Sequence, residues 1–144
     1  MIQIRRQAIV RQTPERMFDL VNDVEAYPRR FAWCADAAVL AREGEQALTA
    51  RLDLRFAGMT QAFTTHNTFE RPHRLSMHLV DGPLRALDGE WSFTALGDDG
   101  CKVAFALDFD YSGRLGGVAL RLGFQGLANR MVDEFCAAAM REHG

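Results

Sequence analysis

The sequence predicts an α+β fold in which a curved antiparallel sheet of seven strands wraps around one long C-terminal helix. From residue 33 onward, segments that alternate apolar and polar residues recur at the spacing of about 8–12 residues that is typical of an antiparallel meander. Residues 114–142 contain no proline and place apolar residues at helical spacing. The chain has 144 residues, the usual size of one domain, so residues 1–144 are expected to fold as one unit.

The first elements are a strand and two short helices. Residues 2–11 alternate like a half-buried strand. The pair Thr13-Pro14 combines a helix-capping residue with a proline suited to the first helical position, which predicts a helix over residues 14–21 with its apolar side inward. A second short helix is expected to begin at Asn22-Asp23. Pro28 should end it at Tyr27, because the residue before a proline avoids the helical region.

Six further strands complete the predicted sheet. They lie over residues 33–42, 46–56, 60–70, 74–81, 87–96 and 101–111. The final helix over 114–142 would be about 40 Å long, at about 1.5 Å per residue. A strongly curved sheet and a single helix cannot fill the space between them. This helix-grip arrangement therefore predicts an internal cavity.

The stretch DGPLRALDGEW at residues 81–91 contains two Asp-Gly pairs, each a common hairpin signal. Pro83 stops the strand that precedes it, and residues 84–86 should form a connection. Gly89 then falls inside the next strand, where a glycine indicates a bulge or a close backbone approach. A bulge there would direct Trp91 into the end of the cavity; the alternative is that Trp91 is simply a core residue.

Four separate motifs resemble the coenzyme Q-binding START-like family. They are DGPLRALDGEWSF at 81–93, AYPRRFAWC at 26–34, FTTHNTF at 63–69 and RMVDEFCAAA at 130–139. The family has a START/Bet v 1-like fold within the polyketide cyclase/dehydrase superfamily, and its bacterial members include ribosome association toxin proteins. The resemblance implies ubiquinone binding in the cavity and support of respiration. For some bacterial members it also implies binding to the large ribosomal subunit.

A quinone carrier needs an apolar lining, because burial contributes roughly 25 cal/mol per Å² of apolar surface without any polar contact. The predicted strands and the long helix supply many candidates. Alternation does not say which face of each strand lines the cavity. The candidates are Leu52, Leu54, Phe56, Phe63, Leu79, Trp91, Phe93, Phe105, Leu107, Phe109, Leu122, Met131, Val132 and Phe135.

The mouth of the cavity is predicted at the turn Phe56-Ala57-Gly58-Met59, with the helix start at Leu115 to Val118 as the opposite lip. In the alternative, Phe56 and Met59 fold back into the core. The first half of the long helix also contains Gly116, Gly117, Gly123 and Gly126. Each interior glycine costs about 1 kcal/mol relative to alanine, so either close packing or a helix that loosens to admit ligand should offset this cost.

A net charge of −2 argues against a strongly basic nucleic-acid-binding surface. Arginines nevertheless cluster locally at Arg5, Arg6, Arg11 and Arg16, and again at Arg29-Arg30. The ordinary explanation is a solvated rim. The alternative is a contact with ribosomal RNA, which would require these arginines on one surface.

Little in the sequence points to catalysis. No metal-ligand spacing involves His66, His73 or His78, so no catalytic residue, metal or required cofactor is expected. The three cysteines are odd in number and widely spaced, which predicts reduced thiols. No signal peptide or membrane span is apparent, and a cytoplasmic location is expected.

The predicted function is therefore a non-catalytic carrier that holds ubiquinone, or a similar isoprenoid quinone, and transiently contacts the inner membrane surface. The first alternative is a protein that binds the large ribosomal subunit and blocks subunit association. The second is a polyketide cyclase-like enzyme, whose turnover would depend on His66 or His78.

Overall fold

A computed structural model describes residues 1–111 and 116–143, and it contains the antiparallel sheet that the sequence predicts. Its strands are β1 (Ile2–Val10), β2 (Cys34–Glu43), β3 (Ala47–Phe56), β4 (Met59–Glu70), β5 (Arg74–Asp81), β6 (Leu84–Leu96) and β7 (Gly100–Tyr111). The spatial order is β1-β7-β6-β5-β4-β3-β2. Strands β2 to β7 thus form a meander, and β1 pairs with the last strand.

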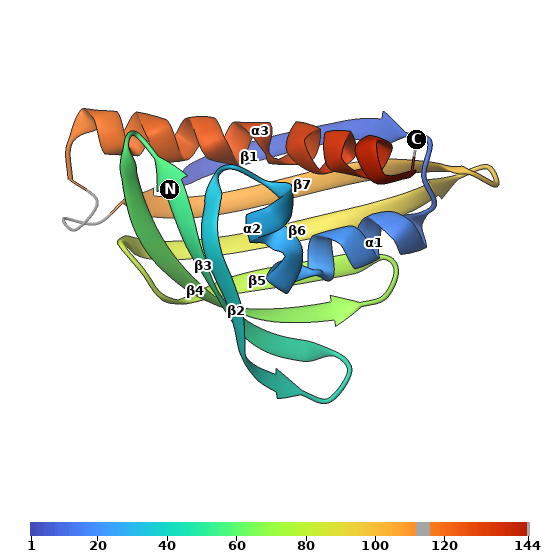
Figure 1. Ribbon diagram of the computed structural model, residues 1–144, viewed down its shortest axis with the longest axis horizontal. Helices are drawn as coiled ribbons and strands as arrows, with labels where there is room; N and C mark the ends of the chain where they lie inside the picture. Colours follow the sequence, from blue (N-terminus) through green and yellow to red (C-terminus); the bar gives the residue numbers. More distant parts are fainter. Residues whose placement is uncertain (112–115, 144) are drawn as a thin grey trace.

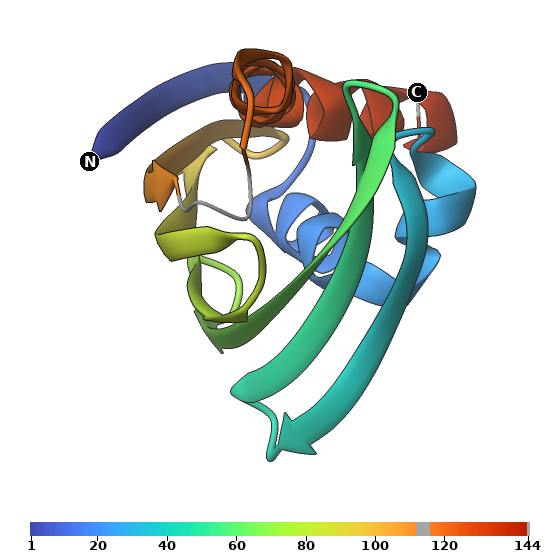
Figure 2. The same ribbon diagram turned by 90° about the vertical axis from the view of Figure 1, so that its left-hand side faces the viewer.

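The helical elements are α1 (Pro14–Asn22), the 3₁₀ turn η1 (Val24–Ala26), α2 (Tyr27–Arg30) and α3 (Val118–His143). Figure 1 shows α3 running along β1 and β7, with α1 and α2 on the same side of the sheet. Seen along α3 in Figure 2, the sheet curls around an interior that the helices close. This is the predicted helix-grip arrangement.

The start of α1 follows from its capping sequence. The side-chain oxygen of Thr13 accepts a hydrogen bond from the backbone N–H of Arg16 at 3.2 Å, and Pro14 occupies the first helical position. Met17, Phe18 and Val21 are buried, as predicted. The apolar side of α1 therefore anchors this helix against the sheet.

Three elements have boundaries that differ from the prediction by more than one residue. Pro28 lies inside α2 near its N-terminus, because a proline in the first turn lacks only an N–H that would have no helical partner. β6 begins at Leu84, and the register shift between Leu84 and Ala86 shows that the predicted connection is a bulged part of the strand. α3 begins at Val118; of the predicted helix start, residues 114–115 lie outside the described residues.

Gly89 is a site of close approach rather than a bulge. It keeps a regular register, opposite Met77 on β5 and Leu107 on β7. A Cβ atom at this position would lie 2.7 Å from Cε of Met77 and 3.1 Å from Cδ1 of Leu107, closer than van der Waals contact. Two residues later, Trp91 is 3% exposed and stacks on Phe105 with ring centroids 4.4 Å apart.

Gly123 supports the packing explanation for the glycines of α3. A Cβ atom there would lie 3.0 Å from Cβ of Ala57 and 3.3 Å from its backbone nitrogen. The glycine therefore lets the tip of the β3–β4 hairpin touch α3. Gly126 differs, because only the Arg130 side chain lies within 4 Å of its Cβ position, at 3.7 Å.

Candidate functional site

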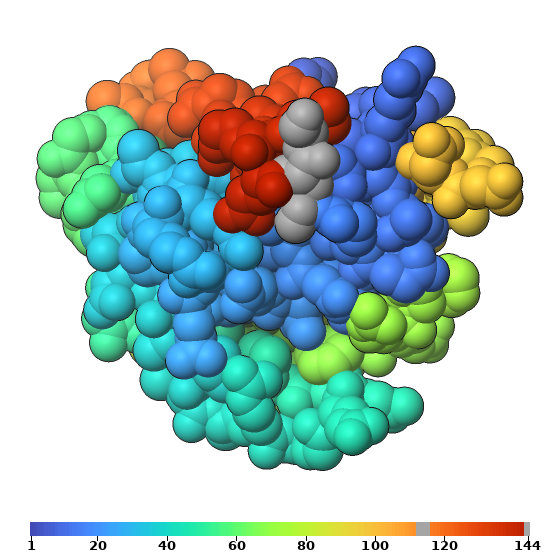
Figure 3. Space-filling view, turned by 45° about the vertical axis from the view of Figure 1, so that its right-hand side comes forward, coloured from blue at the N-terminus to red at the C-terminus, as the bar shows by residue number. Residues whose placement is uncertain are grey.

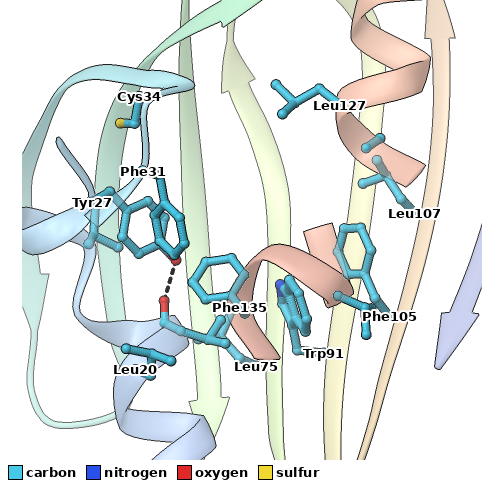
Figure 4. Packing of buried hydrophobic residues seen from close by; sticks show 14 of the residues in the cluster. Leu20, Tyr27, Phe31, Cys34, Leu75, Trp91, Phe105, Leu107, Leu127 and Phe135 are labelled. Atoms are coloured by element: carbon cyan, nitrogen blue, oxygen red, sulfur yellow. Dashed lines mark hydrogen bonds between the residues drawn. The ribbon is translucent and has the colours of Figure 1, made fainter. Parts of the chain in front are cut away.

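An apolar cavity of about 100 Å³ lies between the sheet and α3. Figure 4 shows part of its wall, with Trp91, Phe105 and Phe135 close together and Leu107 and Leu127 further along. The full lining is Tyr27, Trp33, Leu52, Leu54, Phe63, Thr65, Met77, Leu87, Trp91, Phe105, Leu107, Phe124, Leu127, Ala128, Met131 and Phe135. The wall is therefore built by α3, by strands β3 to β7 and by Tyr27 and Trp33 of the α2 region.

Aromatic rings pack tightly at the end of the cavity near α2. The ring of Phe135 on α3 lies 5.2 Å from Trp91 and 5.3 Å from Tyr27, in edge-to-face arrangements. Trp33 stacks on Phe31 with centroids 4.6 Å apart. Such pairs contribute about 0.5–1.5 kcal/mol each beyond burial of their area. These ring contacts close the end of the cavity near α2.

The polar groups on the wall are engaged with other protein groups. Nε1–H of Trp33 donates to Oε1 of Glu134 at 2.8 Å, and the hydroxyl of Thr65 donates to Oδ1 of Asn67 at 2.8 Å. The Tyr27 hydroxyl donates to the backbone carbonyl of Val21, and burial strongly raises the pKa of this phenol. A molecule in the cavity would therefore be held mainly by apolar contact.

Eight of the fourteen predicted lining residues face this cavity. Leu52, Leu54, Phe63, Trp91, Phe105, Leu107, Met131 and Phe135 do so. Phe56, Phe93, Phe109 and Val132 are buried in the core beside the cavity, and Leu79 packs partly buried against that core. The prediction for Leu122 is wrong: it is 64% exposed, because its helical stripe faces away from the sheet.

Sequence reasoning missed several lining residues. Phe124 and Leu127 follow the apolar helical spacing of residues 114–142, and Thr65 lies two residues after Phe63 on the same strand face, so the sequence carries a signal for each of them. Tyr27 and Trp33 belong to the AYPRRFAWC motif but reach the cavity only through tertiary folding of α2 onto α3.

The predicted entrance residues divide between core and surface. Phe56 is buried, with its ring 5.7 Å from Phe124 and 6.3 Å from Phe63. It therefore closes the end of the cavity next to the β3–β4 turn. Met59 is 50% exposed and Val118 is 72% exposed, whereas Leu115 lies outside the described residues. The prediction that both Phe56 and Met59 form an exposed lip is therefore wrong for Phe56.

Arg5 and Arg6 lie on opposite faces of β1, so the four N-terminal arginines do not all share one surface, and only Arg6, Arg11 and Arg16 are left as a candidate group for RNA contact. Arg5 stands opposite Ala106 and Arg6 opposite the inward-facing Phe105, so strand alternation puts them on opposite faces. Arg5 also forms an ion pair with Asp108 at 2.8 Å. Within the described part of the chain, no acidic side chain pairs with Arg6, or with Arg11 and Arg16.

Of the second arginine pair, Arg30 is neutralised. Its guanidinium contacts Asp23 at 2.9 Å and Glu142 at 2.8 Å, which raises the pKa of Arg30 despite burial and pins α2 to the end of α3. Figure 3 shows the end of α3 seated against the α2 region and the N-terminal part of the chain. Arg29 is exposed.

His66 and His78 lie away from the cavity. His66 and His78 face each other across β4 and β5 on the outer side of the sheet, opposite to the side of Phe63 and Thr65. His78 Nδ1 lies 2.6 Å from Oδ1 of Asp88. Among residues 1–111 and 116–143, no cluster of His, Cys, Asp and Glu could hold a metal ion. No helix in this part of the chain is long and apolar enough to cross a membrane.

Comparison with known proteins places these features in a wider group. Residues 10–136 match the family model described as "Polyketide cyclase / dehydrase and lipid transport". The "Ribosome association toxin RatA" of Pseudomonas aeruginosa is 39% identical over 141 residues, covering 98% of this chain and 97% of that protein. The "Persistence and stress-resistance toxin PasT" of Escherichia coli is 39% identical over 139 residues, covering 96% of this chain and 87% of that protein.

Solved structures share the fold. The Zhui aromatase/cyclase from Streptomyces sp. R1128 superposes with a TM-score of 0.83 at 17% identity, covering 97% of this chain and 94% of that one. A START superfamily protein from Mycobacterium smegmatis gives 0.82 at 18% identity, covering 96% and 97%. These likenesses concern the fold alone.

Proposed function

This chain belongs to the polyketide cyclase, dehydrase and lipid transport family, and we propose that within it the protein binds the large ribosomal subunit and interferes with subunit association. The observation that carries this proposal is similarity over 98% of the chain to a relative named as a ribosome association toxin. The proposal reverses the order of the two main functions predicted from the sequence.

The size of the cavity also favours ribosome binding over quinone binding. Pockets for drug-sized ligands usually measure about 300–1,000 Å³, and an engineered apolar cavity of about 150 Å³ accommodates benzene. The cavity here is about 100 Å³. A quinone ring with an isoprenoid tail would enter only if α3 and the sheet moved apart, whereas ribosome binding needs no such opening.

Unpaired surface arginines are the natural contacts for ribosomal RNA. Arg6, Arg11 and Arg16 are exposed and lie on β1, the following turn and α1. Each guanidinium that meets a phosphate releases counterions, so affinity falls with salt by a slope of about 0.7–0.9 per contact. Arg5 is a weaker candidate because Asp108 already neutralises it.

Sedimentation of ribosomal subunits tests the proposal. Purified protein added to dissociated subunits in low salt should sediment with the large subunit and reduce the peak of assembled ribosomes. Changing Arg6, Arg11 and Arg16 to Gln should weaken binding and flatten its salt dependence. The matched control changes Arg42, Arg51 and Arg71, each of which is paired with an acidic side chain. An unchanged subunit profile with wild-type protein would refute the proposal.

An isoprenoid quinone remains the second candidate, supported by the apolar, aromatic wall of the cavity. The proposal requires no cofactor for chemistry and treats the quinone as a bound ligand. Both tryptophans, Trp33 and Trp91, line the cavity, so ubiquinone should quench most of the tryptophan fluorescence on entry. Mass spectrometry of lipids that co-purify with the protein is the direct test. Absence of both quenching and co-purifying quinone would remove this candidate.

A further inference from the structure

The side of α3 that faces solvent is apolar in its first turns, where a surface helix is ordinarily polar. Val118 is 72% exposed and Leu122 is 64% exposed. These residues are four apart in the helix and therefore lie on the same side. Single exposed apolar side chains are common, but a group of them marks an interaction surface.

The β3–β4 hairpin adds a third apolar side chain to the same end of the molecule. Figures 1 and 2 both show the hairpin tip beside α3. The contact is direct, because the Cβ position of Gly123 lies 3.0 Å from Cβ of Ala57 in the hairpin. Met59, two residues after Ala57, is 50% exposed. Met59, Val118 and Leu122 are called the apolar patch below.

The charge around the apolar patch is entirely positive along the two segments that form it. Residues 118–132 of α3 contain no Asp or Glu, and neither do residues 54–65 of the hairpin. The same segments contain Arg55, Arg121 and Arg130. Asp53 stands opposite Ala62 in the hairpin but is paired with Arg51, and the exposed Asp81 stands opposite Thr64. The excess of positive charge on the two segments therefore rests on Arg55, Arg121 and Arg130.

From this combination we propose that the apolar patch docks onto the surface of an anionic phospholipid bilayer, with its side chains among the acyl chains and the arginines at the headgroups. Exposed apolar residues flanked by arginines are the pattern of helices that lie in a membrane interface. A protein partner is a poorer fit, since a stable interface takes about 20–30 residues from each side. RNA is also a poorer fit, because three exposed apolar side chains would make no favourable contacts with its charged backbone. The proposal goes beyond ribosome binding and does not depend on it.

Vesicle flotation tests the proposal with the full chain. Wild-type protein should float with vesicles of phosphatidylcholine and phosphatidylglycerol and bind at least about tenfold more weakly to pure phosphatidylcholine. Changing Val118 and Leu122 together to Asp should lower binding to the anionic vesicles by about tenfold or more, because each aspartate must be desolvated in the interface. Changing Arg121 and Arg130 to Gln should abolish the preference for anionic vesicles.

The matched control changes Ile9 and Leu40 to Asp, because these are similarly exposed apolar residues on β1 and β2. This variant should bind like the wild type. The proposal is overturned if wild-type protein binds neither vesicle, or if the Val118/Leu122 variant binds anionic vesicles as well as the Ile9/Leu40 variant does. It is also overturned if the wild type self-associates through the patch without binding lipid. Binding of the wild-type protein to the two kinds of vesicle tests the membrane proposal even if a variant fails to fold. No outcome of flotation bears on the proposed binding to the ribosomal subunit.

Discussion

Replacing Ala128 by leucine would fill the cavity and so separate the two candidate functions. Ala128 is 4% exposed and lines the cavity from α3. If the cavity of about 100 Å³ were filled completely, recovery of about 24 cal/mol per Å³ would stabilise the fold by about 2.4 kcal/mol. Imperfect fit should leave a gain of about 0.5–2 kcal/mol. For a chain of this size that corresponds to a rise in Tm of about 2–6 °C.

Urea unfolding measures the stability of the Ala128→Leu variant, and tryptophan quenching and subunit sedimentation measure its two activities. We expect higher stability, no quenching by ubiquinone and unchanged ribosome binding. Ala137→Leu is the control, because Ala137 is exposed on the same helix. A loss of stability greater than about 1 kcal/mol would mean that the cavity cannot accept the side chain. Loss of ribosome binding in a folded variant would refute the assignment of that activity to the surface.

Three further predictions concern stability and thiol chemistry. Gly126→Ala should stabilise the protein by up to about 1 kcal/mol through helix propensity. Gly123→Ala should bring no gain or a loss of stability, because its Cβ would press on the β3–β4 hairpin. Thermal melts of the two variants would contradict this prediction if both showed the same rise in Tm. Glu134→Ala should cost about 1–3 kcal/mol in urea unfolding, because the Trp33 indole N–H loses its acceptor; an unchanged midpoint would show that water replaces the carboxylate. Burial, followed by the charge of Asp133, raises the pKa of the Cys136 thiol to about 11. The folded state therefore binds this proton more tightly than the unfolded state, and the free energy of unfolding should fall as pH rises from about 9 toward 11. Ellman's reagent should react slowly with Cys136 below that range, and a fast reaction with the folded protein would contradict the burial.

The strands were predictable because a half-buried sheet imposes a period of two on its sequence. Phe63, Thr65 and Asn67 alternate with Thr64 and His66 along β4, and all three point to the interior. The hairpin signals and the uninterrupted helical stripe of α3 supplied the rest of the topology. These patterns do not show which face of each strand points to the interior, because alternation separates two faces without saying which one meets α3.

The errors came from features that depend on contacts distant in sequence. Pro28 was expected to end a helix, but packing of Tyr27 on Phe135 favours a new helical turn that begins there. Leu122 fitted an apolar stripe, yet that stripe faces solvent because α3 meets the sheet through Phe124 and Leu127 instead. The volume of the cavity was also beyond sequence reasoning, because it depends on how the rings of several elements interlock.

The two candidate functions make opposite demands on α3. A quinone carrier must separate α3 from the sheet, which breaks the Trp33–Glu134 hydrogen bond and the ring contacts of Phe135. A ribosome-binding protein can keep these contacts, since its proposed arginines lie outside the cavity. Bound quinone should therefore speed amide exchange around Trp33 and Glu134 relative to the outer strands, whereas the large ribosomal subunit should leave exchange there unchanged. Faster exchange with the ribosomal subunit alone would mean that ribosome binding also works through the cavity, and the separation of the two activities would fail.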